Sequence, residues 1–119
     1  LADQIKKEQP GMAGTDLMQA VFDQDDDIVG YAFDVDAGEM KIYQNGTLRD
    51  TITGIPTGVT YMPIIGDDSS TDAQFECNFG GVSAYTISSG NTDGKYGNFE
   101  YAPPAGYYAL CTKRLAEFG

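Results

Sequence analysis

The sequence predicts one all-β domain, an antiparallel β-sandwich, and three observations support this fold class. Glycine is frequent, with 15 among 119 residues, and turn-forming Asn, Asp and Pro are scattered between short apolar runs. From residue 28 onward, apolar and polar residues alternate with the period of two that is typical of half-buried strands. The dipeptide Asn45-Gly46 separates two such runs, and both of its residues tolerate the positive φ of a tight hairpin. The length fits a single domain.

A three-stranded meander is expected over residues 28–53. The first strand covers residues 28–35, which are rich in β-branched and aromatic side chains. The second covers residues 40–44, and the third returns over residues 47–52 after the Asn-Gly turn. The residues of the first strand that share one face are Val29, Tyr31, Phe33 and Val35.

Two further strands are expected after the meander. Residues 61–65 contain Pro63, which favours an edge position or a bulge because proline cannot donate to a strand ladder. Residues 73–79 alternate cleanly and turn Cys77 toward the core, so we expect a buried thiol there. With Cys111 as the second cysteine, the chain permits one disulfide and no zinc site from cysteines alone.

Charge and composition exclude several classes of function. The formal net charge is −11 with only seven basic residues, so the chain lacks the positive footprint that nucleic-acid binding needs. The chain contains no histidine, which removes the commonest general base and metal ligand. No run of apolar residues approaches the length of a membrane span. We therefore expect no enzyme, no cofactor, no nucleic-acid partner and no membrane insertion; the acidity favours solubility, with cation binding or a basic partner as alternatives.

Three segments carry a resemblance to a known family. Residues 28–46 (IVGYAFDVDAGEMKIYQNG) resemble the central hairpin of SPRY domains, where an aspartate-rich turn precedes a strand that ends in Asn-Gly. Residues 75–80 (FECNFG) look like the later Asn-Phe-Gly strand of that family. Residues 101–115 (YAPPAGYYALCTKRL) are similar to the close of SPRY domains in virion proteins of tailed bacteriophages.

The resemblance implies a fold and an organisation of the chain. It implies a sandwich of the SPRY type, a concanavalin-like jelly roll, over residues 28–119. SPRY domains carry several strands before the central hairpin, whereas only 27 residues precede it here. We expect residues 1–27 to form a loop or short-helix lead-in, or to be a remnant of upstream strands. The sandwich would then lack its N-terminal strands in this chain.

The polar, glycine-rich loop over residues 88–101 is the best candidate for recognition. Tyr and Asn combine rigid contact area with adaptable hydrogen bonds, as antibody paratopes do, and a tyrosine face can stack on a sugar ring. An ordinary surface loop with inward-facing tyrosines remains the alternative. The candidate ligand-binding residues are Asn91, Asp93, Lys95, Tyr96, Asn98 and Tyr101.

An acidic cluster is the second candidate site. Four aspartates lie within residues 23–27, and Asp34 and Asp36 follow. Carboxylates in this density can converge on Ca²⁺. The EF-hand template fails, because Ile28 falls where glycine is required and Asp34 falls where the bidentate glutamate belongs. We expect a solvated turn rather than a metal site.

The resemblance and the missing catalytic groups together imply a non-catalytic virion protein. We expect it in a tail fibre, a head decoration or a similar appendage, as a homo-oligomer or part of a larger assembly. Its partners would be other virion proteins and a host-surface glycan or protein. A purely structural capsid or tail subunit and a cellular SPRY adaptor that binds a peptide remain alternatives.

Overall fold

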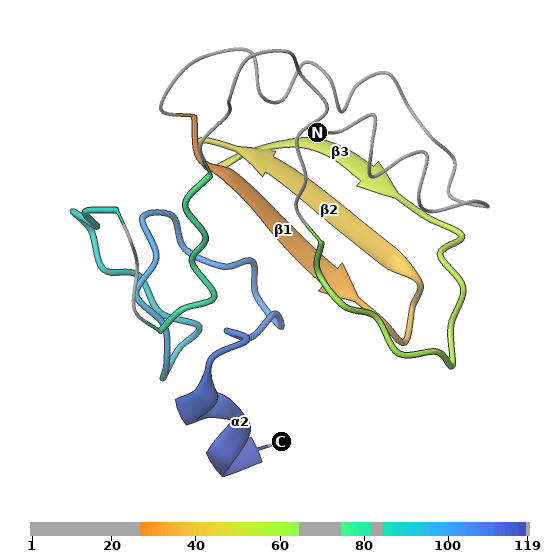
Figure 1. The fold of residues 1–119 in the computed structure, drawn as a ribbon. Helices are drawn as coiled ribbons and strands as arrows, with labels where there is room; N and C mark the ends of the chain where they lie inside the picture. Colours follow the sequence, from red (N-terminus) through yellow and green to blue (C-terminus); the bar gives the residue numbers. More distant parts are fainter. Residues whose placement is uncertain (1–26, 65–74, 82–84, 119) are drawn as a thin grey trace. The chain divides into compact units, whose positions relative to one another are not determined.

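The computed structural model describes residues 27–64, 75–81 and 85–118 of the chain (Figure 1). The chain divides into two compact units, residues 1–73 and residues 74–119. Each unit is described by itself below. The aspartates before Asp27 and most of the expected lead-in segment lie outside the described residues.

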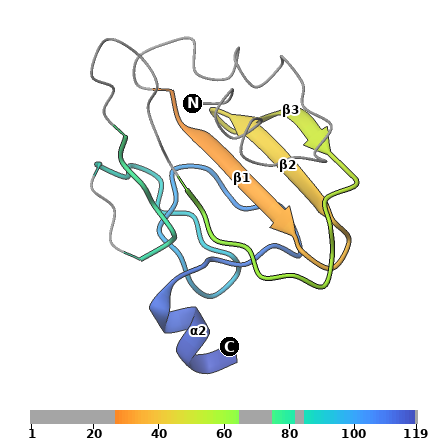
Figure 2. The ribbon, with the colours of Figure 1, turned by 45° about the vertical axis from the view of Figure 1, so that its right-hand side comes forward.

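The first unit contains a three-stranded antiparallel sheet. Its strands are β1 (Val29–Asp34), β2 (Glu39–Gln44) and β3 (Thr47–Ile52). They lie in the order β1-β2-β3, so β2 is the central strand and β1 and β3 flank it (Figure 2). The meander expected from the sequence is confirmed.

The core of this unit lies on one face of the sheet. Tyr31 pairs with Ile42, so the period-two pattern puts Val29, Tyr31 and Phe33 on the same face as Ile42. Ile42 is fully buried and forms the cluster with Ile52 and Ile55. The partly buried residues packed against this cluster are Val29, Phe33, Met40 and Tyr61.

Two residues of the expected apolar face are not covered. Tyr31 is 44% exposed although its neighbours on the strand pack on the core. Val35 lies beyond the end of β1, in the turn, and is 40% exposed. In β3 a register shift leaves Arg49 without a partner on β2, so Leu48 opposes Tyr43 and is half exposed.

Side chains fix both turns of the meander. Asn45 and Gly46 have φ values of 47° and 82°, as the two central residues of a tight hairpin require. The Asn45 side chain also accepts a hydrogen bond from the Ile28 N–H at 2.9 Å and donates one to Asp27 at 2.7 Å. In the turn between β1 and β2, the Asp34 carboxylate accepts from the N–H groups of residues 36 and 37.

The segment after β3 packs back along the sheet. The Ile55 N–H donates to the Gly38 carbonyl at 3.0 Å. The ring of Tyr61 meets Phe33 edge-on with centroids 5.1 Å apart, and the Tyr61 hydroxyl donates to the Pro56 carbonyl. Residues 61–64 do not form the strand expected there. Pro63 has no N–H to donate to a ladder, and Tyr61 is held by its ring and hydroxyl contacts instead. Ile65 lies outside the described residues.

The second unit is mostly irregular and ends in the short helix α2 (Thr112–Phe118). Among its described residues, an isolated bridge between Asn91 and Phe99 is the only strand-like pairing. Its small core contains Ala109 and Cys111, which are 5% and 7% exposed. Gly80 is packed so tightly that a Cβ there would lie 2.8 Å from both the Phe99 ring and the Ala109 side chain.

The prediction of a strand over residues 73–79 is wrong for residues 75–79, the part that the structure describes. Cys77 is exposed, not buried, and Phe75 and Phe79 are 39% and 45% exposed. The segment is held by a side chain instead of a ladder: Asn78 donates to the Asn98 carbonyl and accepts from the Gly80 N–H. The buried thiol of the chain is Cys111. The described residues therefore form a β-rich fold with little helix.

Replacing Gly38 with alanine tests the packing of the first turn. Gly38 has a φ of 65°, and a Cβ there would lie 2.3 Å from the Ile55 carbonyl oxygen. We expect Gly38→Ala to lower the free energy of unfolding by about 2–4 kcal/mol, from left-handed strain plus a steric clash. Gly54→Ala is the matched control, because φ is 74° there and nothing lies within 4 Å. Urea unfolding should show a loss of about 1 kcal/mol for the control, and equal losses would contradict the role of the clash.

Candidate functional site

The recognition loop, residues 88–101, is closed at its neck by backbone hydrogen bonds. The Asn91 N–H donates to the Phe99 carbonyl at 2.8 Å, and the Phe99 N–H donates back to the Asn91 carbonyl at 2.9 Å. The Asn91 side chain crosses the same neck and donates to the Glu100 carbonyl at 2.8 Å. Asn91 is thus engaged within the loop by both its backbone and its side chain.

Glu100 binds the beginning of the loop to its end. Its carboxylate accepts from the Ser88 N–H at 2.7 Å and from the Ser88 hydroxyl, and its carbonyl accepts from the Ser89 hydroxyl. The hydrogen bond from the Ser88 side chain, followed by the one from its backbone, lowers the pKa of Glu100. The loop is therefore fixed at both ends by groups that sequence analysis did not single out.

Asp93 organises the tip of the loop. One carboxylate oxygen accepts from the N–H groups of Lys95 at 3.0 Å and Tyr96 at 2.8 Å. The other accepts from the Ala109 N–H at 2.9 Å and lies 3.3 Å from the Arg114 guanidinium. Desolvation raises the pKa of Asp93, but these amide hydrogen bonds and the Arg114 charge outweigh it, so the pKa lies below its usual value.

The tip of the loop contacts α2. The Lys95 ammonium and the Tyr96 hydroxyl both bind the Glu117 carboxylate. The Lys95 ammonium also lies 5.4 Å from the centre of the Tyr96 ring and 5.2 Å from the centre of the Phe118 ring. Lys95 remains half exposed, with 52% of its side-chain surface accessible.

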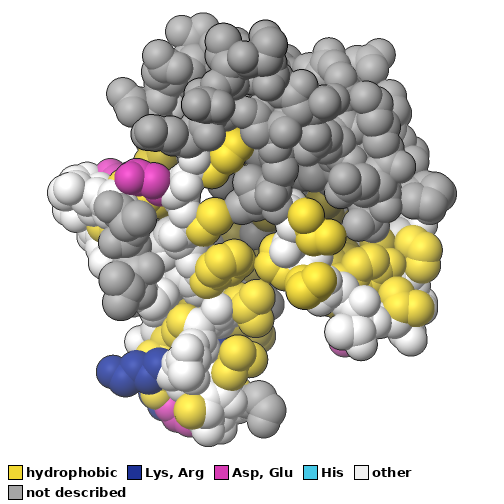
Figure 3. Space-filling view, viewed as in Figure 1, with side chains coloured by type: hydrophobic (Ala, Val, Ile, Leu, Met, Phe, Trp, Pro, Cys, Tyr) yellow, Lys and Arg dark blue, Asp and Glu magenta, His cyan; other side chains and the backbone are white. Residues whose placement is uncertain are grey.

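A contact between α2 and the segment before it was also missed by sequence analysis. The Arg114 guanidinium lies 3.9 Å from the centre of the Tyr108 ring and 4.3 Å from the centre of the Phe118 ring. Arg114 and Phe118 are four residues apart, a spacing that brings side chains together on one helix face. That spacing was the available signal, although it gives no information about Asp93 or Tyr108. Figure 3 shows basic, acidic and hydrophobic side chains side by side around α2.

The structure divides the predicted ligand-binding residues into two groups. The side chains of Asn91 and Asp93 already bind other groups of this unit, and the Asp93 side chain is inaccessible to solvent. Lys95, Asn98 and Tyr101 are exposed, and Tyr96 is half-buried with its hydroxyl on Glu117. The exposed residues are those that a ligand can reach.

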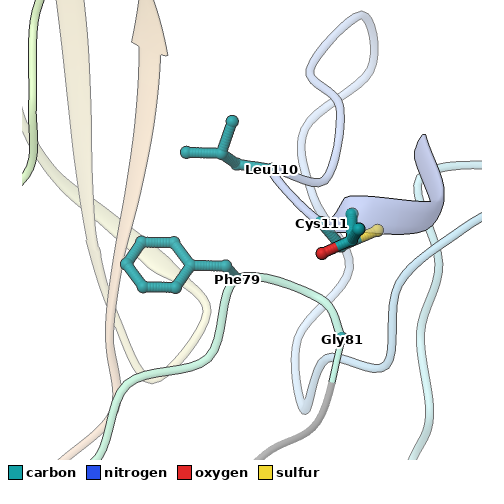
Figure 4. A pocket seen from close by; sticks show the side chains of 5 residues that line it. Phe79, Gly81, Leu110 and Cys111 are labelled. Carbon is teal, nitrogen blue, oxygen red and sulfur yellow. The ribbon is translucent and has the colours of Figure 1, made fainter. Parts of the chain in front are cut away.

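An open pocket lies beside the loop, in the same unit. Its lining residues are Phe79, Gly81, Leu110, Cys111 and Thr112. In the view of Figure 4 the side chains of Phe79 and Leu110 point in the same direction, and both are about half exposed. Neither a carboxylate nor a cation lines this pocket in the described part of the chain.

The acidic residues that the structure describes do not gather into a metal site. Within residues 27–64, 75–81 and 85–118, no group of three or more potential metal ligands comes together. Asp34 of the acidic cluster caps a turn, and Asp27 binds the side chains of Gln44 and Asn45. The same residues contain no helix that is long and apolar enough to span a bilayer.

Comparison with known proteins adds no relative. No protein-family model matches the chain, and neither a curated protein nor a solved structure matches it.

The lowered pKa of Asp93 predicts a pH dependence of stability. Because the pKa is lower in the folded than in the unfolded state, the carboxylate stabilises the fold at neutral pH. This contribution is lost as the pH falls from the unfolded value, about 3.9, through the folded pKa. Urea midpoints measured from about pH 3 to about pH 7 should fall less steeply in acid for Asp93→Asn than for the wild type.

The control for that measurement is Asp36→Asn, which removes the same charge from an exposed turn residue. It shows how far the removal of one negative charge from the surface changes the urea midpoint by itself. If the urea midpoint of Asp93→Asn falls with pH as steeply as that of the wild type, the charge of Asp93 does not contribute to the loss of stability in acid.

Proposed function

We propose that this chain is a non-catalytic binding module of the SPRY type, in an exposed appendage of a phage virion. The observation that carries the proposal is the recognition loop, which is tied by its own hydrogen bonds and still presents Lys95, Asn98 and Tyr101 to solvent. A loop fixed before binding loses little conformational entropy when a ligand arrives. Binding groups are commonly placed on loops that a rigid scaffold holds.

The sequence resemblance gives the proposal its biological setting. The hairpin of β1 and β2, the Asn-Phe-Gly segment and the tail over residues 101–115 follow one another as in SPRY domains of tailed-phage virion proteins. In this proposal the three-stranded sheet is part of a sandwich, a concanavalin-like jelly roll. The role is attachment to a host-surface glycan or protein, and many copies on one particle would raise a weak affinity through avidity.

A purely structural subunit is the second candidate, and one observation favours it. The segment after β3 exposes three apolar side chains, Val59, Met62 and Ile64, at 51%, 73% and 56%. Exposed apolar side chains this close together are typical of surfaces that another protein covers. In this case neighbouring virion subunits would be the partners, and the recognition loop would have no receptor.

The attachment role is tested by substitutions at the exposed loop residues. We expect Asn98→Ala and Tyr101→Ala to reduce adsorption of particles to host cells by about tenfold each, because each removes a contact worth about 1.4 kcal/mol. Particle yield and unfolding midpoint should stay unchanged. Thr51→Ala, an exposed substitution on β3, is the control and should leave adsorption unchanged. Full adsorption by both loop variants would argue against attachment through this loop.

The structural role makes a different prediction. Met62→Ser removes the most exposed apolar side chain of the segment after β3 without touching the core cluster. If neighbouring subunits cover this surface, quantitative mass spectrometry of purified particles should find several-fold fewer copies of the chain. An unchanged copy number, together with reduced adsorption of the loop variants, would leave attachment as the function.

A further inference from the structure

We propose that Tyr108 and Phe118, held by Arg114, form the platform of a binding site for an acidic saccharide, one that carries a carboxylate on a pyranose ring. The inference rests on the proposed attachment function and deepens it, because it names the ligand class and extends the site from the recognition loop to α2. None of these three residues belongs to the loop.

The Arg114 guanidinium, which both rings of the platform contact, is held in place by the Asp93 carboxylate. Arg114 lies 3.3 Å from the Asp93 carboxylate, and only 15% of its side chain is exposed. Its guanidinium carbon lies over both rings, 3.9 Å from the Tyr108 centroid and 4.3 Å from the Phe118 centroid. The rings nevertheless remain 64% and 57% exposed. Arg114 thus covers part of each ring, and more than half of each residue's surface is accessible to solvent.

Two exposed aromatic rings suit a sugar. The C–H groups on one face of a pyranose are apolar and weakly positive, and they pack against the negative face of an aromatic ring. The hydroxyls around the sugar then need polar partners at the rim. The Lys95 ammonium and the Glu117 carboxylate lie at that rim and bind each other, but 52% and 37% of their side-chain surfaces stay accessible. An ammonium has three donors and a carboxylate several lone pairs, so both keep capacity for a sugar hydroxyl beside that bond.

The charge near the platform favours an acidic sugar over a neutral one. The whole chain has seven basic residues against 18 acidic ones. Three of the seven lie by aromatic rings of this unit: Lys95 and Lys113 by the Tyr96 ring, and Arg114 by the rings of the platform. Lys95 is paired with Glu117, and Arg114 is paired with Asp93.

Lys113 is the cation available to the ligand. It is exposed, its ammonium lies 6.0 Å from the centre of the Tyr96 ring, and no carboxylate of the described residues lies within ion-pair distance of it. A sugar carboxylate that reaches Lys113 would supply the missing partner. The surrounding negative charge of the chain would repel anions that cannot make this contact.

The experiment uses the whole chain on a glycan array that carries sialic-acid-terminated and uronic-acid-terminated oligosaccharides beside their neutral counterparts. We expect binding to carboxylated glycans and weak binding to neutral ones. Calorimetric titration with the best carboxylated glycan then gives the dissociation constant for each variant. Tyr108→Ala and Phe118→Leu should each weaken binding about tenfold. The leucine keeps apolar volume and removes only the ring.

Charge is tested separately from stacking. Lys113→Gln should reduce the preference for carboxylated over neutral glycans by about tenfold, and binding should weaken with added salt. Arg49→Gln on β3 removes the same charge elsewhere and should change nothing. Equal binding of neutral and carboxylated glycans, or unchanged affinity in the Tyr108 and Lys113 variants, would overturn the inference.

A cell-adhesion assay with the purified chain separates this inference from the proposed function. Adhesion to host cells without binding to any carboxylated glycan would leave attachment standing and overturn the acidic-saccharide site. A chain that binds neither cells nor glycans would overturn both.

Discussion

The second, C-terminal unit depends on the hydrogen bonds and the ion pair that the Asp93 carboxylate accepts. Four donors converge on it: the N–H groups of Lys95 and Tyr96 from the loop tip, the Ala109 N–H from the segment before α2, and the Arg114 guanidinium from the helix. Two of its donors shape the loop, and two join the loop to residues far along the sequence. Because this unit has little regular secondary structure, one buried charge replaces the many ladder bonds that a sheet would provide.

The first unit depends on a different constraint, the geometry of two turns. Asn45 and Gly46 accept positive φ, and the Asn45 side chain then reaches back to Asp27 and Ile28 at the start of β1. Gly38 lets the Ile55 backbone approach closely at the other turn. With both turns fixed, the register of the sheet is fixed, and Ile42 is carried to the centre of the apolar cluster. Here local sequence determines the packing, whereas in the C-terminal unit distant residues do.

This difference explains what could be predicted from the sequence. The meander was predictable because periodicity and the Asn-Gly turn are local signals. The strand at residues 75–79 was not, because alternation alone does not supply a partner strand, and Asn78 instead binds the Asn98 carbonyl. Within the candidate site, the loop itself was predictable from its composition. Arg114, Glu117 and Phe118 were not, because their contacts with the loop depend on where α2 packs.

The loop also shows why composition alone cannot assign a binding residue. Asn91, Asp93 and Asn98 all have polar side chains, yet those of the first two already bind other groups of this unit, while Asn98 is exposed and its backbone carbonyl accepts from Asn78. A polar side chain whose hydrogen bonds are already made within the protein has little to offer a ligand, since the exchange would cost as much as it gains. Exposed side chains with unused binding capacity are therefore the better candidates. In this unit they include Lys113, whose ammonium has no ion pair among the described residues, and Tyr108, whose side chain is 64% exposed.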